Sequence, residues 1–426
     1  MNIGICGAGT VAGGLVRLLS NNEQLLKARI GKPINIVQIG SRNKPRQPEF
    51  EAFAFTDDVF EVAKNPSVDV LVELIGGTDD ALALVRMALQ SGKSVVTANK
   101  ALIAQHGEEL FQLAEEKGQQ LVFEAAVAGS IPIIKVMRES LVGNEIAAVV
   151  GIINGTTNFI LSQMSKPGST VGFEEALAEA QQLGYAEADP TFDVEGLDAA
   201  HKLTILSAIA FGTRLSFDAI YTQGIGKVQV EDIRFAGELG YRLRHLGITR
   251  IGPDGVELRV HPTLIDENEM LAQVDDVMNA VMVLSDAASQ TLHCGPGAGA
   301  GPTASSVLSD LVDLSRGAII PAMGFLPGQT IDLPVLGIEQ CRSHFYLRLR
   351  VADRPGVLSR ITRILGDFDI SIEALLQKDP VNDIATIVIT TDQVVEEKMN
   401  TAIQKLESSG DVLESVTLIR IFDFGG

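Results

Sequence analysis

The N-terminal segment constrains the fold of this chain more than any other part. The run MNIGICGAGTVAGGLVRLLS reads as an apolar strand, a glycine-rich turn and an amphipathic helix. In dinucleotide-binding proteins this order places one glycine in the tight turn and a second where a pyrophosphate approaches the start of the helix. A glycine turn with a purely architectural role is the alternative. We predict cofactor contacts at Gly7, Ala8, Gly9, Thr10 and Val11, with Ala12 in the third position of the fingerprint.

Strands and helices continue to alternate after this turn. DVLVELIGG and SVVTANKALIA read as strands, with the helix ALALVRMALQSG between them. Such alternation predicts a parallel, doubly wound α/β sheet of the Rossmann type. Ligands bind outside the carboxyl ends of the strands in such sheets, so Lys100 should project toward nicotinamide and substrate. A lysine that only caps the next helix is the alternative.

The end of the second strand, NIVQIG, bears on the choice of cofactor. An NAD-preferring site usually has an acidic residue here for the ribose 2′-hydroxyl, whereas this chain has Ser41 and Arg42. Arg42, with Lys44 and Arg46 nearby, could accept a 2′-phosphate. The sequence therefore favours NADP, or the use of both NADP and NAD, over the alternative of an exposed basic loop.

An acidic run, GYAEADPTFDVEGLDAAHK, leads into a helix that soon becomes almost wholly apolar. Asp198 and Lys202 lie at i and i+4 on the first half of that helix, next to a half that should be buried. Burial lowers the pKa of a lysine and a neighbouring aspartate raises it, so this lysine could exchange a proton near neutral pH. The alternative is a surface ion pair that contributes about 0.2–0.5 kcal/mol.

Two further polar turns precede helices. In INGTTNFILSQM, the residues from Asn154 to Thr157 should cap a helix, and their hydroxyl and N–H groups could also hold a carboxylate. GPGAGAGPTA precedes another helix, and its Gly299 and Gly301 would lie near the nicotinamide if the chain returns to the first domain. A simple hinge explains these glycines equally well.

Size and composition narrow the class of protein. A chain of 426 residues can form two or three domains, and we expect three. Its net charge of −20 argues against nucleic acid or an anionic membrane as the main partner. The cysteines, Cys6, Cys294 and Cys341, have neither disulfide nor zinc spacing, and neither an export signal nor a membrane span is evident. We expect an enzyme of the reducing cytoplasm that acts on a small substrate.

Taken together in this order, the motifs GAGTVAGG, TANKALIA, FEAAVAGSIPII, NGTTNFIL, GYAEADPTFDVEGLDAAHK and GPGAGAGPTA resemble homoserine dehydrogenase over residues 1–335. The resemblance implies reversible NAD(P)H-dependent reduction of L-aspartate 4-semialdehyde to L-homoserine, on the route to threonine, methionine and isoleucine. It implies that Lys202 is the proton donor, that Asp198 orients it, and that Lys100 lies near the reacting carbon. Glu187 matches the position that takes the substrate ammonium, and Asp193 matches a neighbouring acidic position. Thr157 lies in the turn that would hold the substrate carboxylate.

The same resemblance implies a bound sodium or potassium ion. In the family, main-chain oxygens hold this ion, and the matching positions are Glu124, Val127, Gly129 and Ile131. Carbonyl oxygens are hard ligands that suit such cations.

The C-terminal part begins after a segment rich in Pro and Gly, PAMGFLPGQTIDLPVLG, which reads as a linker. The elements that follow, with a hairpin turn at DPVND, have the order βαββαβ of a ferredoxin-like domain. With DRPGVL after its first strand, this part resembles an ACT domain. The resemblance implies feedback control by L-threonine at Asp353, Gly356 and Val357, although Ser371 stands where many relatives have Asn and leaves another amino acid possible as effector. A module that only dimerises is the alternative.

The predicted architecture is a Rossmann-type domain over 1–130, completed by a helix at 303–335, an α+β catalytic and dimerisation domain over 131–302, and an ACT domain over 343–426. The family and the pairing of ACT sheets suggest a homodimer or homotetramer. Two other functions fit the same chain: another small amino-acid or hydroxy-acid dehydrogenase, and a non-catalytic sensor of amino acids and NADP. A substrate panel separates these functions.

Overall fold

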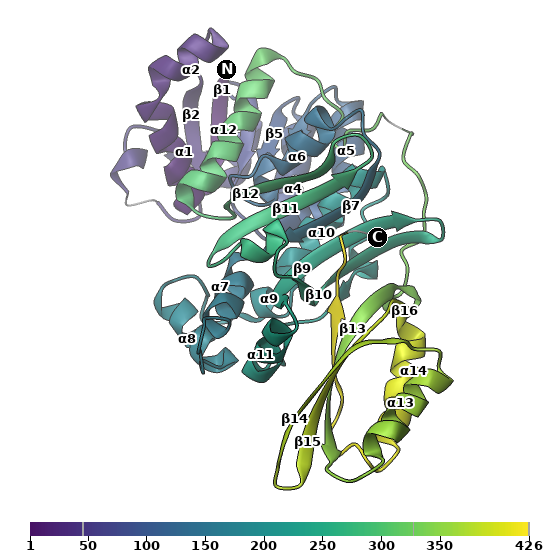
Figure 1. Ribbon diagram of the computed structural model, residues 1–426. Helices are drawn as coiled ribbons and strands as arrows, with labels where there is room; N and C mark the ends of the chain where they lie inside the picture. Colours follow the sequence, from purple (N-terminus) through teal and green to yellow (C-terminus); the bar gives the residue numbers. More distant parts are fainter. Residues whose placement is uncertain (45–46, 327, 425–426) are drawn as a thin grey trace.

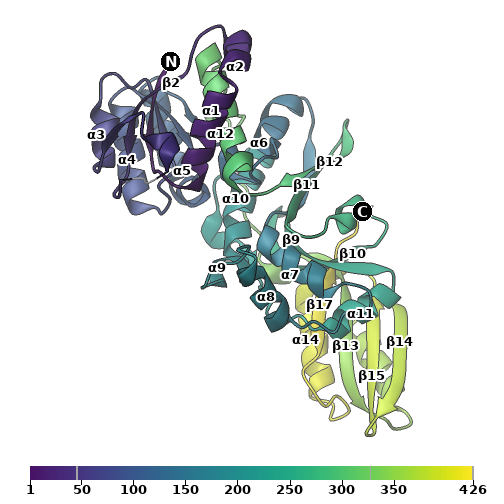
Figure 2. The same cartoon turned by 90° about the vertical axis from the view of Figure 1, so that its left-hand side faces the viewer.

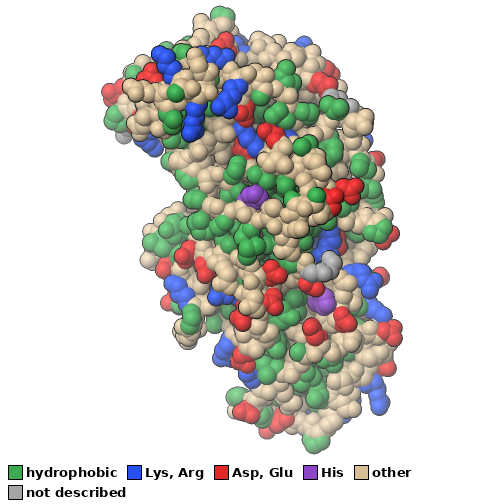
Figure 3. Space-filling view, turned by 45° about the horizontal axis from the view of Figure 1, so that its top comes forward, with side chains coloured by type: hydrophobic (Ala, Val, Ile, Leu, Met, Phe, Trp, Pro, Cys, Tyr) green, Lys and Arg blue, Asp and Glu red, His purple; other side chains and the backbone are tan. Residues whose placement is uncertain are grey.

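The molecule consists of three regions arranged one after another. A computed structural model describes residues 1–44, 47–326 and 328–424. The N-terminal and C-terminal regions lie at opposite ends, with a mixed region between them, and the last described strand returns toward the middle region (Figures 1 and 2). Figure 3 shows that one side of the molecule is hollowed between the N-terminal region and the middle region.

The N-terminal region is a parallel sheet of the predicted Rossmann type. Its strand order is β3-β2-β1-β4-β5-β6, and all neighbouring strands are parallel. Its strands and main helices are β1 (Asn2–Cys6), α1 (Thr10–Asn21), α2 (Glu23–Ile30), β2 (Asn35–Gly40), β3 (Ala54–Thr56), α3 (Val59–Lys64), β4 (Val70–Glu73), α4 (Asp79–Gln90), β5 (Ser94–Thr97), α5 (Lys100–Glu116) and β6 (Leu121–Val122).

Both faces of this sheet are buried, as a parallel sheet requires. Ile3 and Ile5 of β1 point into one core with α1, whereas Cys6 points into a second core with α3, α4 and α5. A helix from far along the chain, α12 (Ala300–Arg316), completes the first of these layers by packing beside α1 (Figure 2). The prediction of a helix at 303–335 was therefore too long at its C-terminal end, because Gly317 adopts a left-handed conformation and ends the helix.

A glycine of α1 makes the close approach of α12 possible. A Cβ atom at Gly14 would lie 2.2 Å from the carbonyl oxygen of Ala300. No ordinary side chain fits that space, so this glycine sets the distance between the two helices.

The middle region is an antiparallel sheet with helices packed against it. Its strand order is β12-β11-β7-β9-β10. Its main elements are α6 (Ile133–Lys135), β7 (Ile146–Ile152), α7 (Gly155–Met164), α8 (Phe173–Gln182), α9 (Thr191–Val194), α10 (Leu197–Phe211), β8 (Tyr221–Thr222), α11 (Val230–Glu238), β9 (Tyr241–Gly252), β10 (Gly255–Asp266), β11 (Met278–Ser285) and β12 (Ser289–Pro296). Every residue of α10 after Leu197 is buried, between this sheet and α5 of the first region.

The C-terminal region has the predicted ferredoxin-like order βαββαβ. Its elements are β13 (Arg342–Ala352), α13 (Val357–Asp367), β14 (Ile372–Val381), β15 (Ile384–Thr391), β16 (Val394–Val395), α14 (Glu396–Glu407) and β17 (Thr417–Ile421). The expected hairpin turn over DPVND is shorter than predicted. β14 continues to Val381, and Asn382 and Asp383 alone make the turn with φ of +53° and +61°.

One sheet runs through the middle and C-terminal regions. β17 pairs with β10 in parallel and with β13 antiparallel, so the two regions share a continuous sheet (Figure 1). The helix α11 packs on one face of the C-terminal strands, and α13 and α14 pack on the other. Over the described ranges, we find no helix with the length and apolar character needed to span a membrane.

Candidate functional site

The centre of the candidate site is an ion pair on the first half of α10. The Lys202 ammonium donates a 2.7 Å hydrogen bond to Asp198 Oδ2 and another of 2.7 Å to the carbonyl oxygen of Ile153, at the end of β7. The two side chains are only 11% and 8% exposed. The alternative of an ordinary surface ion pair is therefore wrong, and the pair lies in a nearly dry environment.

A second lysine, from the first region, reaches the same carboxylate. Lys100 is the first residue of α5, and its Nζ lies 3.1 Å from Asp198 Oδ1. The Asn99 side chain caps this helix by accepting the N–H of Leu102, so the lysine is not itself the cap. Asp198 thus holds one lysine with each of its carboxylate oxygens and joins two regions of the chain.

Asn154 connects this cluster to a second carboxylate. As predicted, it caps α7, with its Oδ1 accepting the N–H of Thr157. Its Nδ2 donates to Asp198 Oδ2 at 2.8 Å and to Asp193 Oδ1 at 2.7 Å. The Thr156 hydroxyl lies 3.3 Å from the other oxygen of Asp193. The cap signal in the sequence identified Asn154, but its link between the carboxylates came only from the structure.

Burial and charge shift the pKa values of this cluster in opposite directions. Burial lowers the pKa of Lys202, and Lys100 lowers it further, whereas Asp198 raises it in part. Burial would raise the pKa of Asp198, but the ammonium groups of Lys202 and Lys100 outweigh it and hold that pKa well below its usual value. Burial is also the main cause that raises the pKa of Asp193. The cluster therefore keeps Asp198 ionised while it weakens the hold of Lys202 on its proton.

The remaining substrate-site candidates near this cluster differ in how deeply they are buried. The Thr157 hydroxyl is buried and donates to the carbonyl oxygen of Asn154, within the helix cap. Glu187 lies exposed in the loop between α8 and α9, where its carbonyl oxygen accepts from the Gln181 amide. Phe192 of α9 is 41% exposed, and its ring centroid lies 5.7 Å from Lys100 Nζ. No pattern in the sequence indicated this aromatic neighbour.

The glycine turn after β1 has the shape that a dinucleotide requires. Gly7 has φ of +103°, and a Cβ atom there would lie 2.5 Å from the carbonyl oxygen of Leu74. At Gly9, apart from its own atoms and those of its two chain neighbours, no described atom lies within 4 Å of the position that a Cβ would take. Gly9 precedes Thr10 and Val11 at the start of α1, where the described residues provide no side-chain cap. The start of α1 therefore combines uncapped N–H groups with open space beside Gly9, which fits an anionic pyrophosphate.

Other cofactor candidates lie at the ends of the same sheet. Arg42 is exposed just after β2, whereas Arg46 lies outside the described residues. Gly299, with φ of +126°, precedes α12, and Gly301 lies exposed in its first turn. Ala8 lies half-buried in the glycine turn.

The four residues expected to hold a cation lie in one buried loop between β6 and α6. The carbonyl oxygens of Glu124, Gly129 and Ile131 accept hydrogen bonds from Val127 N–H, the Ser306 hydroxyl and Ile133 N–H. A carbonyl oxygen has two lone pairs, so each of these groups keeps one for a cation. The main-chain donor set therefore fits a hard cation.

The Glu124 side chain takes a separate role. Its two carboxylate oxygens accept the N–H groups of Ile134 and Lys135 at 3.0 and 2.9 Å, at the start of α6. Burial, aided by the nearby charge of Asp310, raises the pKa of Glu124 to about 8. The Glu124 carboxyl group thus binds the backbone at the start of α6.

The effector candidates lie together at the first turn of the C-terminal region. The Asp353 N–H donates to the carbonyl oxygen of Asp383, which joins this turn to the β14–β15 hairpin. Gly356 has φ of +87° and begins α13, and Val357 is buried in the core of the region. Arg360 of α13 lies beside them and donates two hydrogen bonds, of 2.6 and 2.8 Å, to Asp411.

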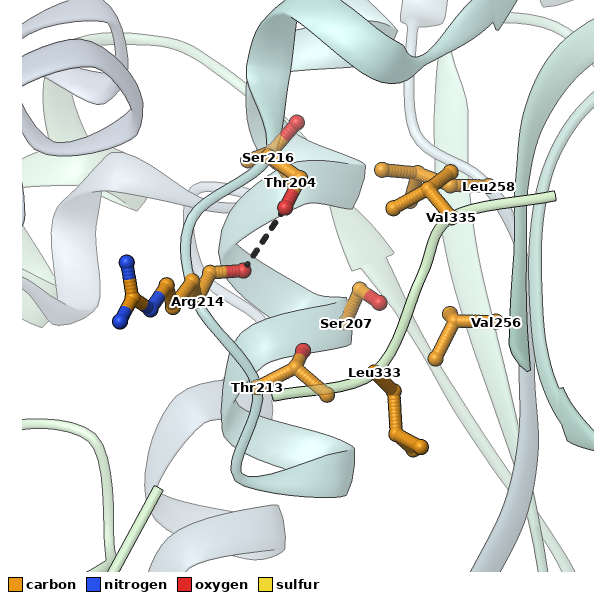
Figure 4. A pocket seen from close by; sticks show the side chains of 9 residues that line it. All are labelled: Thr204, Ser207, Thr213, Arg214, Ser216, Val256, Leu258, Leu333 and Val335. Atoms are coloured by element: carbon orange, nitrogen blue, oxygen red, sulfur yellow. Dashed lines mark hydrogen bonds between the residues drawn. The ribbon is translucent and has the colours of Figure 1, made fainter. Parts of the chain in front are cut away.

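A small cavity occurs elsewhere along α10. It is bordered by the linker residues Leu333 and Val335 (Figure 4). Thr204 and Ser207, from the C-terminal half of α10, line it with Thr213, Arg214, Ser216, Val256 and Leu258. Asp198 and Lys202 do not line this cavity, so it is separate from the lysine and aspartate cluster.

Comparison with known proteins gives a consistent result over the whole chain. Residues 132–312 match the homoserine dehydrogenase family, residues 7–124 match its NAD-binding domain, and residues 345–408 match the ACT domain. The homoserine dehydrogenase of Pseudomonas aeruginosa is 50% identical, and the alignment covers 99% of this chain and 98% of that protein. The enzyme of Neisseria gonorrhoeae is 47% identical, with the same coverage.

Solved structures with a similar fold are also homoserine dehydrogenases. A homoserine dehydrogenase from Thiobacillus denitrificans has a TM-score of 0.95 and 48% identity, and the match covers 100% of this chain and 99% of that one. A hyperthermophilic archaeal homoserine dehydrogenase, solved in complex with NADPH, has a TM-score of 0.63 and 28% identity over 75% of this chain and 98% of its own. The N-terminal region is thus a domain that binds a nicotinamide cofactor. The chain is an oxidoreductase and belongs to the homoserine dehydrogenase family.

Proposed function

We propose that this enzyme interconverts L-aspartate 4-semialdehyde and L-homoserine with NADPH or NADH, and that Lys202 transfers the proton. One observation supports this assignment above all. A buried carboxylate, Asp198, binds Lys202 from its own helix and Lys100 from the dinucleotide-binding region. The cluster therefore lies where a cofactor bound to the first region would meet a substrate bound to the middle region.

The chain's own groups can manage the proton. A bound nicotinamide supplies or accepts the hydride, which generates or consumes an alkoxide on the substrate. Lys202 has three N–H donors and uses two of them on Ile153 and Asp198, so the third can face the substrate oxygen. Its lowered pKa eases proton release, and Asp198 keeps the ammonium oriented. A positioned proton donor of this kind typically contributes about 10²–10⁴-fold to the rate.

Groups around the same cluster could bind an amino-acid substrate. Asp193 and Glu187 are the acidic candidates for the substrate ammonium, because a carboxylate forms strong charge-assisted hydrogen bonds with that group. The turn from Asn154 to Thr157, at the start of α7, is the candidate for the substrate carboxylate. Held at both ends, the substrate would present its reacting carbon near Lys100.

We propose NADP as the preferred cofactor. Ser41 and Arg42 follow β2, where an acidic residue would favour NAD. A guanidinium group can pair with a 2′-phosphate in a bidentate manner.

A sodium or potassium ion bound by the main chain between Glu124 and Ile131 is part of the proposal. Among the described residues, no group of three His, Cys, Asp or Glu side chains could hold a metal ion, so such a cation would depend on main-chain oxygens. Its role would be structural, in fixing the loop that joins the first region to α6.

Regulation by L-threonine at Asp353, Gly356 and Val357, assembly as a homodimer or homotetramer, and a cytoplasmic location are the further expectations. The ACT match supports binding of an amino acid in the C-terminal region. Calorimetry with threonine, methionine and isoleucine would identify the effector, and loss of the signal in Asp353→Ala would locate it.

The catalytic assignment is tested by Lys202→Met, with Lys27→Met on the exposed helix α2 as the matched control. We expect kcat for homoserine oxidation to fall by about 10²–10⁴-fold in the first variant and to remain unchanged in the second. Binding of NADPH, followed by its fluorescence, should be the same in both. Full activity of Lys202→Met would reject the proposed proton donor.

A further inference from the structure

A short segment, Tyr221 to Ile225, connects the C-terminal region with the helix that carries Asp193. It begins with β8, which runs parallel to β10. The next residue extends this pairing, because the Gln223 N–H donates a 2.8 Å hydrogen bond to the carbonyl oxygen of Val260. One side of this segment contacts β17, and the other side contacts α9. We call it the 221–225 segment.

On the C-terminal side, a buried arginine holds the segment. Arg420 of β17 is 4% exposed and bonds to both oxygens of Glu396 through its Nε and Nη2. Its Nη1 donates to Gln223 Oε1 at 2.9 Å, and Nη2 donates to the Tyr221 hydroxyl at 3.2 Å. Because Glu396 fixes the guanidinium, the position of the Gln223 side chain follows that of β17.

On the other side, the segment contacts α9 through its backbone. The Ile225 N–H donates to the carbonyl oxygen of Val194 at 3.0 Å, and Ile225 is fully buried. A Cβ atom at Gly224 would lie 2.6 Å from that same oxygen and 3.0 Å from the Cα atom of Glu195. The segment therefore fits closely against the end of α9.

A histidine of the sheet makes a second connection. The His245 Nε2 atom lies 3.0 Å from the carbonyl oxygen of Gln223. The same imidazole packs on Gly196, where a Cβ atom would lie 3.1 Å from its Cε1. Gly196 directly precedes α10, so this contact reaches the start of the helix that carries Asp198.

The helix α9 depends on such contacts because it is only four residues long. A single turn is not stable by its own hydrogen bonds and takes its position from what packs against it. Asp193 lies in this turn, next to Val194, and its carboxylate is bound to Asn154 of the active-site cluster. A shift of the 221–225 segment would thus move Asp193 relative to Asp198.

We propose that Gln223 is a positioning residue through which the C-terminal region sets the place of Asp193 in the substrate site. The proposal rests on the substrate-binding role of Asp193 given above. It makes the affinity for substrate, rather than hydride transfer or cofactor binding, depend on the contact between β17 and the 221–225 segment.

Two variants test the two sides of the segment in the full-length enzyme. Gln223→Met keeps the size of the side chain but removes the acceptor for Arg420, and it leaves the pair of Arg420 with Glu396 intact. Gly224→Ala presses directly on α9. Gly226→Ala is the matched control for the second variant, since no described residue other than its two chain neighbours has an atom within 4 Å of its Cβ position. Lys378→Met is the control for the first, because it removes a different contact between the regions, the ion pair with Glu238.

We expect KM for homoserine to rise about 5-fold or more in Gln223→Met, as for typical couplings between sites. In Gly224→Ala a rise of roughly 10–100-fold is expected, since small misplacements of binding groups are costly. In both variants kcat and KM for NADP should stay within about twofold of the parent, and both controls should match the parent in all constants. A split of this kind is not produced by a general loss of folded protein, which lowers kcat instead.

Asp193→Asn separates the two claims. If Asp193→Asn raises KM for homoserine and Gln223→Met does not, the coupling proposal is overturned, whereas the substrate-binding role of Asp193 is retained. This conclusion holds even if Gly224→Ala raises KM. If Asp193→Asn leaves KM unchanged, the substrate role of Asp193 is wrong and the proposal falls with it. A rise in KM for NADP equal to that for homoserine in Gln223→Met would also overturn it.

Discussion

The charge of Asp198 should control the pH at which Lys202 loses its proton. In Asp198→Asn, the amide oxygen can still accept from Lys202 and Asn154, while the amide NH2 group replaces the oxygen that Lys100 contacts. The hydrogen bond to Lys202 is therefore kept while the negative charge disappears. Lys202 then keeps the two influences that lower its pKa, burial and the nearby Lys100, and loses the one that raises it most. The protonated lysine becomes less stable.

The size of this change follows from the distance. Opposite unit charges 2.7 Å apart, as in this pair, attract each other by about 6 kcal/mol at an effective dielectric constant of about 20. The side chains are only 11% and 8% exposed, so solvent screens the pair little. A tenfold change in the ratio of protonated to neutral lysine corresponds to about 1.4 kcal/mol, so the effect on protonation should be large even if only part of this attraction is lost.

The assay is the pH dependence of kcat/KM for reduction of the semialdehyde, which reports the free enzyme. Reduction needs the protonated lysine, so activity is lost as pH rises through the pKa of Lys202. A lower pKa in Asp198→Asn therefore moves this loss to lower pH. Lys100→Met should have the opposite effect, because Lys100 lowers the pKa of Lys202.

The opposite signs make the test strict. If both variants lose activity at lower pH, or if neither moves the alkaline limb, then Lys202 is not the group that titrates in the rate. A fall in kcat/KM that is equal at every pH would show that Asp198 acts only through geometry.

Three further predictions concern stability and cofactor choice. Gly14→Ala should lower the free energy of unfolding by about 1–3 kcal/mol, since its Cβ would clash with the backbone of α12. Gly237→Ala, on the open face of α11, should raise the free energy of unfolding by about 0.5–1 kcal/mol, and denaturant titration measures both changes. Arg42→Ala should raise KM for NADPH about 10-fold or more and leave KM for NADH almost unchanged, and equal effects on the two cofactors would contradict a 2′-phosphate contact. Asp232→Ala removes the buried carboxylate that Arg348 Nε contacts at 2.6 Å; it should lower the free energy of unfolding by about 3 kcal/mol, and an unchanged melting temperature would show that this contact does not hold the C-terminal region.

Local patterns in the sequence predicted much of this protein. The strand, glycine turn and helix at the N-terminus, the i and i+4 spacing of Asp198 and Lys202, and the helix cap at Asn154 all depend on residues close in the chain. So does the βαββαβ order of the C-terminal region. Backbone hydrogen bonding and hydrophobic periodicity act over a few residues, which is why a single sequence shows them.

Contacts between distant residues were decided only by the tertiary structure. The sequence left open whether Lys202 forms a surface pair or a buried pair, because burial depends on β7, β9 and α5 packing around α10. Lys100 and Asp198 are far apart in the chain and meet only when two regions close on each other. The pairing of β17 with β10, which turns two expected domains into one continuous sheet, leaves no local signal either. The chain thus fixes which residues can do the chemistry through local spacing, whereas the long-range packing of the folded protein determines their charge states and their neighbours.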